Sequence, residues 1–423
     1  MTPAVHIVGA GLAGLAAAVS LAGRGAAVFL HEATDHAGGR CRSYFEPALG
    51  QLIDNGNHLL LSGNGAALGY LERIGAGAAL AGPPGAAFDF ADLPSGRRWR
   101  VEINDGRLPW WILSARRRAP GTRALDYLAA RRLFTAPGGA SIAERMECRG
   151  PVYERLLRPV LLAALNTEPE AASATLAAAV LRETLLSGGA ACRPLVAAAG
   201  LSAAFIDPAL AWLKRRGVGI RLGHRLRRIR FEDSRAAGLD FGEEVVEIGP
   251  GDSVVLAVPA PAAKGLLPDI AVPESFRAIL NAHYRIAAPA GWPAILGVIG
   301  GEVQWLFAFD DRLSVTISAA DRLIDRDREA LARELWAEVA KLTGLGPALP
   351  PWQIVKERRA TFAALPAEDA KRPSSQTRWT NLFLAGDWTA TGLPATIEGA
   401  IRSGNRAAAA LEAKGLVGPA AAG

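Results

Sequence analysis

Four residues near the N-terminus have the types and spacing that hold the phosphates and ribose of a dinucleotide. Gly9, Gly11 and Gly14 form the pattern G-x-G-x-x-G, and an acid, Glu32, follows them. In this pattern the first glycine allows a tight turn, the second lets a diphosphate approach the backbone, and the third lets a helix pack closely on a strand. The carboxylate accepts hydrogen bonds from ribose hydroxyls. The sequence therefore predicts a dinucleotide site; the alternative is a glycine-rich turn without a ligand.

The elements that would position these residues are a strand, a helix and a second strand. Residues 4–8 form a short apolar run that is typical of a buried strand. A helix rich in alanine and leucine is expected over 12–24, and a second strand over 27–32. Leu12 and Ala13 then lie at the helix N-terminus, which faces the phosphate charge, so both are predicted cofactor contacts.

A second glycine pair indicates which dinucleotide is bound. Gly38, Gly39 and Arg40 follow the acid, and Ser43 comes three residues later. A nicotinamide-binding domain does not need these residues. They resemble the pattern E-x(5)-GGR-x-x-S of flavoproteins such as amine oxidases and phytoene desaturases. Arginine offers a fixed cationic fork for a diphosphate, so the predicted cofactor is FAD rather than NAD.

The C-terminal section resembles the same flavoproteins. An apolar run ends in Gly386-Asp387, and a helix is expected to begin near Thr396 and Ile397. The resemblance implies that Asp387 lies at the diphosphate and ribityl region of the cofactor. It also implies that the helix start faces the N1/O2 edge of the flavin ring, where a helix N-terminus stabilises negative charge.

The resemblance also concerns the adenine end of the cofactor and the way the cofactor is attached. It implies that backbone at Leu226 and the next three residues contacts the adenine. No cysteine or histidine follows His283, so the C-terminal section has no side chain that could form a covalent bond to the flavin. We therefore expect FAD to be bound non-covalently.

Composition excludes several classes of function. Of 423 residues, 50% are hydrophobic and 21% are charged, as in globular proteins. Lysine and arginine number 47 against 41 acids, and no basic tract with interleaved aromatic residues is present, which argues against nucleic-acid binding. The three cysteines, Cys41, Cys148 and Cys192, are too scattered to indicate a zinc site or a disulfide framework, so no metal is expected.

Domain boundaries are indicated by changes in composition along the chain. Residues 1–75, 195–265 and 372–423 are expected to form a Rossmann-type α/β domain with a parallel sheet that binds FAD. Residues 76–194 and 266–371 are expected to form a mixed α+β substrate domain. Helical spacing is found there at 125–134, 152–165, 173–186 and 327–342. Strand-like runs at 282–288, 294–299, 303–308 and 314–318 predict an antiparallel sheet. A hairpin is expected over 88–101 and another strand over 352–362.

Three further segments resemble one branch of these flavoproteins. They are residues 54–63, 165–167 and 357–362, and together they are similar to the hydroxysqualene dehydroxylases of bacterial squalene and hopanoid biosynthesis. The resemblance implies reduction of hydroxysqualene, a long isoprenoid, with loss of its hydroxyl as water and hydride transfer from reduced flavin N5 to an allylic cation. No motif identifies the electron donor that would reduce the flavin.

Three alternatives to the dehydroxylase remain at this point. One is a carotenoid or phytoene-type desaturase or isomerase, and another is a flavin-binding protein without catalytic activity. The third is an amine oxidase, but those enzymes often have a tyrosine where this chain has Thr396, and no tyrosine follows Tyr284.

Residues 54–58 form a polar turn, Asp-Asn-Gly-Asn-His, between apolar residues. One interpretation is that the turn lines the flavin, with Asn57 and His58 as cofactor contacts and catalytic candidates. Because the pKa of histidine lies near neutrality, His58 would relay the proton that releases water. The alternative is an Asx-rich turn that satisfies its own backbone.

The chain begins almost directly with a strand, and its longest uncharged apolar run, 286–301, contains prolines and glycines. Neither a signal peptide nor a transmembrane helix is therefore predicted, and we expect a cytoplasmic protein. Trp110 and Trp111 with arginines 116–118 suit a peripheral contact with the inner face of the cell membrane. The alternative is a core tryptophan pair beside a solvated arginine loop.

Overall fold

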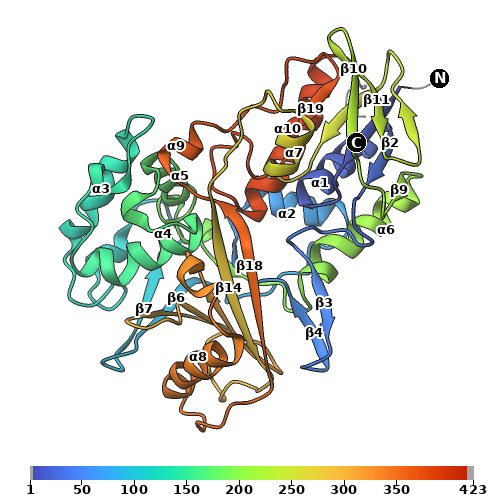
Figure 1. Ribbon diagram of the computed structural model, residues 1–423. Helices are drawn as coiled ribbons and strands as arrows, with labels where there is room; N and C mark the ends of the chain where they lie inside the picture. Colours follow the sequence, from blue (N-terminus) through green and yellow to red (C-terminus); the bar gives the residue numbers. More distant parts are fainter. Residues whose placement is uncertain (1–2, 417–423) are drawn as a thin grey trace.

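A five-stranded parallel sheet forms one half of the protein in the computed structural model, which describes residues 3–416 (Figure 1). The strand order is β19-β13-β1-β2-β9, and every neighbouring pair is parallel. The strands come from sections of the chain that are far apart in sequence. They are β1 (Ala4–Val8), β2 (Ala27–His31), β9 (Gly219–Arg221), β13 (Ser253–Leu256) and β19 (Leu382–Leu384).

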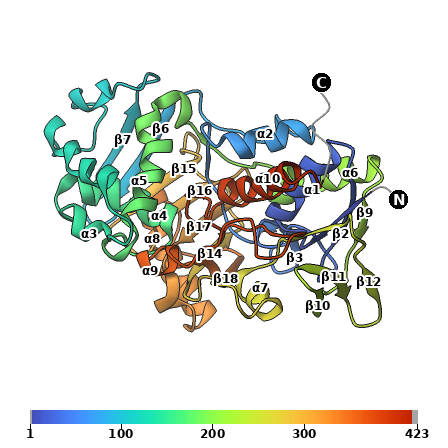
Figure 2. The same cartoon turned by 90° about the horizontal axis from the view of Figure 1, so that it is seen from above.

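Helices cover one face of the parallel sheet. The helix after β1 is α1 (Leu12–Ala22), which is buried along its whole length, and α10 (Ile397–Ala413) packs along it (Figure 2). A side chain at Gly404 would overlap the carbonyl oxygen of Ala13, so the two helices approach closely because this position is glycine. Beside them lie α2 (Gly65–Arg73) and α6 (Asp207–Arg215).

The other face of the parallel sheet packs against a three-stranded antiparallel sheet that the sequence analysis did not predict. Because side chains alternate along a strand, Ile7 faces the helices while Val8 packs against Ile229 and Leu239 of the small sheet. Its strands are β10 (Arg228–Glu232), β11 (Arg235–Asp240) and β12 (Val245–Glu247).

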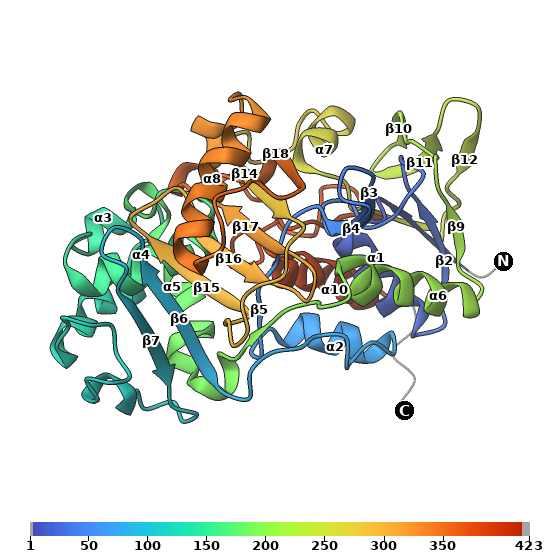
Figure 3. The same cartoon turned by 90° about the horizontal axis from the view of Figure 1, so that it is seen from below.

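A seven-stranded sheet forms the core of the other half of the protein (Figure 3). Its order is β18-β14-β17-β16-β15-β6-β7, and the expected antiparallel pairing holds except between β15 and β6, which are parallel. The strand predicted at 282–288 instead begins six residues earlier and ends at Tyr284. The strands are β6 (Ala86–Asp92), β7 (Arg98–Ile103), β14 (Phe276–Tyr284), β15 (Ile295–Ile299), β16 (Trp305–Ala308), β17 (Leu313–Ile317) and β18 (Trp352–Phe362).

One face of the seven-stranded sheet is apolar and lies under α8 (Arg328–Thr343), close to the helix predicted at 327–342. Leu280 and Tyr284 of β14 face α8, and the Tyr284 hydroxyl donates a hydrogen bond to the carbonyl of Ala332 at 2.8 Å. By alternation, Asn281 and His283 of the same strand face away from α8.

The remaining segments are short. The prediction of a helix at 125–134 holds only in part, because η2 (Ala124–Thr135) is a 3-10 helix. The prediction at 152–165 is met by a π-helical turn, η3 (Tyr153–Leu157), followed by α4 (Arg158–Leu165). The others are β3 (Ser43–Glu46), β4 (Gln51–Asp54), β5 (Leu60–Leu61), η1 (Trp110–Leu113), α3 (Ile142–Arg145), η4 (Pro169–Ala171), α5 (Ala174–Glu183), η5 (Leu185–Ser187), η6 (Gly189–Ala191), β8 (Pro194–Leu195), η7 (Ser202–Ile206), α7 (Ala260–Leu266), η8 (Ala320–Leu323) and α9 (Pro366–Asp369).

Candidate active site

The turn between β1 and α1 has a geometry that requires two of its three glycines. Gly9 has a φ of +106°, in the region that favours glycine. A Cβ at Gly14 would overlap the carbonyl oxygen of Gly9, so α1 could not pack on β1 with any side chain there. A Cβ at Gly11, the N-cap of α1, would meet no atom within 4 Å. The fold thus requires Gly9 and Gly14, whereas Gly11 leaves open space before the helix N-terminus.

Two predicted cofactor residues, Leu12 and Ala13, begin α1 directly after this open space. Both are buried, and no acid lies in the first turn of the helix. The partial positive charge of the helix N-terminus is therefore not neutralised by a carboxylate of its own first turn. This arrangement suits an anionic ligand in front of Gly11.

Glu32 lies just beyond β2 and beside the glycine turn. Its Oε2 accepts a hydrogen bond from the backbone N–H of Ala10 at 2.8 Å, and its Oε1 accepts two from Thr34, at 3.0 and 2.9 Å. The backbone N–H of His224 donates to the carbonyl of Glu32 at 2.7 Å, which brings the loop that carries Leu226 to the same place. The side chain of Leu226 is buried in the core, so a ligand here would meet the backbone of this loop.

The loop with Gly38 and Gly39 lies across the glycine turn. The N–H of Gly38 donates to the carbonyl of Ala10 at 2.8 Å, and both glycines have positive φ, +106° and +58°. A Cβ at Gly39 would lie 3.5 Å from the Cα of Gly11. The two glycine motifs are therefore in contact, and they border the same open space.

Arg40 connects the N-terminal motif with the C-terminal one. Its Nη2 lies 2.7 Å from Oδ2 of Asp387, and its Nη1 donates to the carbonyl of Ala360. The carboxylate of Asp387 raises the pKa of the Arg40 guanidinium. Asp387 is buried, and the preceding Gly386 donates its N–H to Ser403 of α10 at 2.9 Å. The ion pair fixes a cation at the junction of both motifs.

The start of α10 lies in the same part of the protein. Thr396 is the N-cap, and its Oγ1 accepts from the N–H of Gly399 at 3.0 Å, while Ile397 is the first helical residue. The acid in the first turn, Glu398, accepts from the backbone of Ala66 and Ala67 at the start of α2, at 3.1 and 2.8 Å. The Glu398 carboxylate therefore caps α2.

The polar turn 54–58 is bonded to other elements rather than to its own backbone. Asp54 Oδ1 accepts from the Ser43 hydroxyl at 2.6 Å and from the N–H of Leu201 at 2.9 Å. Asn57 Nδ2 donates to Thr316 Oγ1 of β17 at 3.0 Å. These contacts differ from a self-satisfying Asx turn, and they connect the polar turn to the seven-stranded sheet.

The face of the seven-stranded sheet turned away from α8 carries a polar stripe, formed by Asn281, His283, Ser314 and Thr316. The residues are cross-strand pairs of β14 and β17. Thr316 Oγ1 donates to Asn281 Oδ1 at 2.8 Å, and His283 Nδ1 lies 2.7 Å from Ser314 Oγ. Sequence analysis missed the stripe, although polar and apolar residues alternate in both strands, which signals two different environments.

Two histidines near the polar turn are neutral at pH 7. Burial lowers the pKa of His58 to about 4, and the positive charge of Arg40 adds to this effect. Burial also lowers the pKa of His283 to about 3, with a further contribution from Arg312. Asn57 Oδ1 and His283 Nε2 are buried and have no hydrogen-bond partner among the described residues. The positive charge of Arg40, which belongs to the second glycine motif, thus also acts on His58 of the polar turn.

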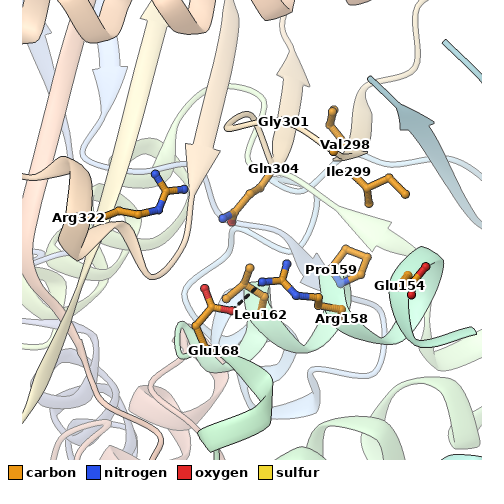
Figure 4. Close-up of a pocket in the computed structure, with 11 residues that line it drawn as sticks. Glu154, Arg158, Pro159, Leu162, Glu168, Val298, Ile299, Gly301, Gln304 and Arg322 are labelled. Atoms are coloured by element: carbon orange, nitrogen blue, oxygen red, sulfur yellow. Dashed lines mark hydrogen bonds and ion pairs between the residues drawn. The ribbon is translucent and has the colours of Figure 1, made fainter. Parts of the chain in front are cut away.

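A separate cavity of about 330 Å³ lies between α4 and the ends of β15 and β16 (Figure 4). Arg158 lies 2.7 Å from Glu168 at its wall, and the lining is strongly charged. The predicted site residues do not line this cavity. Its lining is formed by Glu154, Arg158, Pro159, Leu162, Glu168, Val298, Ile299, Gly300, Gly301, Gln304 and Arg322.

Known proteins show which ligand suits the open space at Gly11. Residues 12–411 match the model of the family described as flavin-containing amine oxidoreductase. The chain belongs to this family. Within the amine oxidoreductases, it is 56% identical over 409 residues to the hydroxysqualene dehydroxylase of Rhodopseudomonas palustris, covering 96% of this chain and 98% of that one. It is 52% identical over 404 residues to the hydroxysqualene dehydroxylase of Sinorhizobium fredii, covering 96% and 97%. These matches confirm the predicted family resemblance.

The fold of this amine oxidoreductase is also shared with solved structures. Cyclohexylamine oxidase from Brevibacterium oxydans aligns with a TM-score of 0.71 and 20% identity, over 98% of this chain and 99% of that one. The predicted α/β class with a parallel sheet and a second sheet is confirmed. The protein is a flavin-dependent oxidoreductase, and the open space at Gly11, the two helix starts and the Arg40–Asp387 pair fit a flavin dinucleotide.

Proposed function

We propose that this amine oxidoreductase catalyses the reductive dehydroxylation of hydroxysqualene to squalene. The observation that carries the proposal is the match of 56% identity, over nearly the whole chain, to a protein named hydroxysqualene dehydroxylase. The polar turn supports it, because residues 54–63 were among the segments that resembled this branch. The substrate is then a long isoprenoid, and the route is that of squalene and hopanoid biosynthesis.

The cofactor in this proposal is FAD, bound non-covalently by residues 1–75, 195–265 and 372–423. Gly9 and Gly14 shape the turn, Gly11 would let the diphosphate approach the start of α1, and Glu32 would hold the adenosine ribose. Arg40 and Asp387 hold the diphosphate and ribityl region, and the start of α10 faces the flavin ring. No cysteine or histidine follows His283, so the C-terminal segments have no residue for a covalent bond.

When bound, reduced flavin supplies a hydride. The chain must then deliver one proton to the substrate hydroxyl, so that the C–O bond breaks with loss of water and a C–H bond takes its place. The pKa of His58 is lowered to about 4, below the near-neutral value on which the expectation of a relay rested, so at pH 7 its neutral ring only passes on a proton that another donor supplies. Asn57, the residue before His58, donates to Thr316 and so ties this turn to β17.

Replacement of His58 by phenylalanine tests this relay. We expect the variant to keep its flavin but to convert bound hydroxysqualene more slowly, by about 100-fold, which is typical of lost proton transfer. The matched control is His36→Phe, because His36 is exposed and its ring contacts Asp35. Equal turnover by the His58 and His36 variants would remove His58 from the mechanism.

The direction of the reaction is tested by an anaerobic single turnover. Photoreduced protein is mixed with hydroxysqualene in detergent, and the product is analysed by mass spectrometry while flavin absorbance is followed. We expect squalene to form as the flavin is reoxidised, and no conversion by oxidised protein. Conversion of squalene or phytoene to more unsaturated products by oxidised protein would instead establish the desaturase alternative.

We further propose that the protein works at the surface of the membrane that holds its substrate, on the cytoplasmic side. No helix within residues 3–416 is long and apolar enough to cross a bilayer. A squalene-like molecule is almost insoluble in water, so its transfer from lipid into the protein avoids contact with solvent. The contact is therefore peripheral in this proposal.

A further inference from the structure

Residues 104–135 expose an unusual number of large apolar side chains. They lie at the end of the protein remote from the N-terminus, in the teal segment at the left of Figure 1, beside β7. Five of the eleven large apolar side chains that are exposed in the described chain belong to this segment. These five are Leu108, Trp110, Leu113, Leu125 and Leu128, and together they form what we call the apolar surface.

The geometry of the 3-10 helices determines which side chains are exposed. A 3-10 helix has three residues per turn, so residues three apart share a face. In η2 the face with Tyr127, Ala130 and Leu133 is turned toward the protein, whereas Leu125 and Leu128 lie on an exposed face. Packing of the opposite face of η2 against the protein therefore keeps Leu125 and Leu128 exposed.

The tryptophan pair of η1 is split between the core and the surface, which corrects the expectation that both would contact a membrane. Trp111 is 3% exposed and packs edge-on against Tyr127 with ring centres 5.1 Å apart. Trp110 is 63% exposed. Trp111 thus anchors η1 against η2, while Trp110 belongs to the apolar surface.

The same segment holds most of the excess positive charge of the chain. It contains seven arginines and two acids, a net charge of +5, against +6 for the whole protein. Of the two acids, Asp126 accepts a hydrogen bond from the backbone N–H of Arg123. Within residues 3–416, Arg117 pairs with Glu102 and Arg118 bonds to backbone carbonyls, while no acid forms an ion pair with the other five arginines, which are Arg107, Arg116, Arg123, Arg131 and Arg132. All five are exposed.

We propose that the apolar surface and its arginines dock on an anionic lipid bilayer. Exposed leucine and tryptophan enter the interface between headgroups and acyl chains, and unpaired arginines attract anionic headgroups. The choice of lipid over a protein partner rests on this charge pattern and on the proposed function, because the substrate is dissolved in lipid.

The interior connects this surface with the candidate active site. Trp111 and Tyr127 belong to one apolar cluster that also includes Leu59, the residue after His58, and Leu61. The cluster contains the aromatic side chains of β6, β7 and β16 as well. Apolar side chains therefore connect η1 and η2 with the segment that follows the polar turn.

Co-sedimentation of the full-length holoprotein with vesicles tests the docking. Vesicles of phosphatidylcholine with phosphatidylglycerol are compared with vesicles of phosphatidylcholine alone, at low and high salt. We expect binding to the anionic vesicles that falls at least tenfold in the triple variant Trp110→Ser/Leu125→Ser/Leu128→Ser. A charge variant, Arg116→Gln/Arg131→Gln/Arg132→Gln, should lose the same binding and its dependence on salt.

The matched control is Phe45→Ser/Leu52→Ser, on the hairpin of β3 and β4. Its two side chains face each other across the hairpin and are 60% and 59% exposed, but they lie outside the arginine-rich segment. Thermal unfolding checks that all variants are folded. The control should bind vesicles like the wild type.

Three results would overturn the docking. They are equal binding by wild type and triple variant, equal loss in the control, or dimers in sedimentation equilibrium that only the triple variant converts to monomers. Turnover of hydroxysqualene in detergent separates this inference from the proposed function. A triple variant that loses vesicle binding but keeps turnover in detergent supports the docking, and a wild type inactive in detergent refutes the proposed function alone.

Discussion

The glycine motifs beside the parallel sheet and the polar turn on the seven-stranded sheet build their sites in different ways. Around Gly9, Gly14 and Gly39 the backbone itself shapes the space, and side chains are excluded by contact or by positive φ. Around Asn57 the side chains make the structure, through hydrogen bonds to Thr316 and from there to Asn281. Substitutions should therefore act on packing in the first region and on hydrogen bonds in the second.

The largest effect is expected from Gly14→Ala. The added Cβ overlaps the carbonyl oxygen of Gly9, which is backbone and cannot rotate away, so we expect the free energy of unfolding to fall by about 3 kcal/mol. The matched variant is Gly11→Ala, whose Cβ meets no protein atom. It should unfold like the wild type in the apo form but bind FAD more weakly. Equal stability of the two apo variants in urea denaturation would contradict this assignment.

Asp387→Ala should have the next largest effect. It leaves the Arg40 guanidinium without its carboxylate partner. Because Arg40 is partly exposed, solvent reduces the cost, and we expect the free energy of unfolding to fall by about 2 kcal/mol. FAD occupancy after gel filtration should fall as well. Asp89→Ala is the control, because Asp89 pairs with the exposed Arg100 at 2.8 Å on a hairpin outside the glycine motifs. If Asp89→Ala loses as much FAD as Asp387→Ala, the loss of FAD is not caused by breaking the Arg40–Asp387 ion pair.

Acid should lower the free energy of unfolding through His283, which lies on the seven-stranded sheet beside the polar turn. Its pKa is about 3 in the folded protein, below the ordinary value of 6.5, so between pH 6.5 and 3 the unfolded chain binds a proton that the folded chain does not. The free energy of unfolding then falls as pH falls, by up to about 1.4 kcal/mol per pH unit for this group. The deficit of His283→Gln relative to wild type should shrink between pH 7 and 5. Parallel curves for the two proteins in urea titrations would exclude this contribution.

Thr316→Val should have the smallest effect. It removes the hydroxyl that accepts from Asn57 and donates to Asn281, at a cost of about 1 kcal/mol. Thr135→Val is the control, because Thr135 is exposed and bonds only to the carbonyl of Arg132, at 3.4 Å. If Thr316→Val is as stable as the control but slower in turnover, the polar turn serves catalysis rather than stability.

One region is shaped by its backbone and the other by hydrogen bonds between distant side chains, and this difference also explains which features the sequence could predict. The glycine pattern, Glu32 and the Gly386-Asp387 run could be predicted, because each is a short motif. The backbone conformation of such a motif depends mainly on neighbouring residues. The prediction of β18 at 352–362 matches its observed bounds for a similar reason, since β propensity and alternation are local.

Long-range features could not be predicted in this way. Asn57 and Thr316 are 259 residues apart, and only the pairing of β14 with β17 brings the polar stripe to the turn. The parallel pairing of β15 with β6 likewise joins segments that are distant in the chain. The prediction that Trp111 contacts a membrane was wrong, because two adjacent tryptophans have the same intrinsic tendency to be buried. Only packing against Tyr127 places Trp111, and not Trp110, in the core.

The order of strands in the parallel sheet has a consequence for synthesis of the protein. β19 is an edge strand of the parallel sheet beside β13, and the loop after it brings Asp387 to Arg40 across 347 residues. During translation the first strands and the glycine turn emerge early, but Arg40 has no carboxylate partner until the end of the chain has been made. Contacts of such long sequence separation form slowly, and the unfinished sheet has an open edge. The Arg40–Asp387 ion pair therefore forms only after the end of the chain has been made, and until then β13 is an open edge that can pair with another chain.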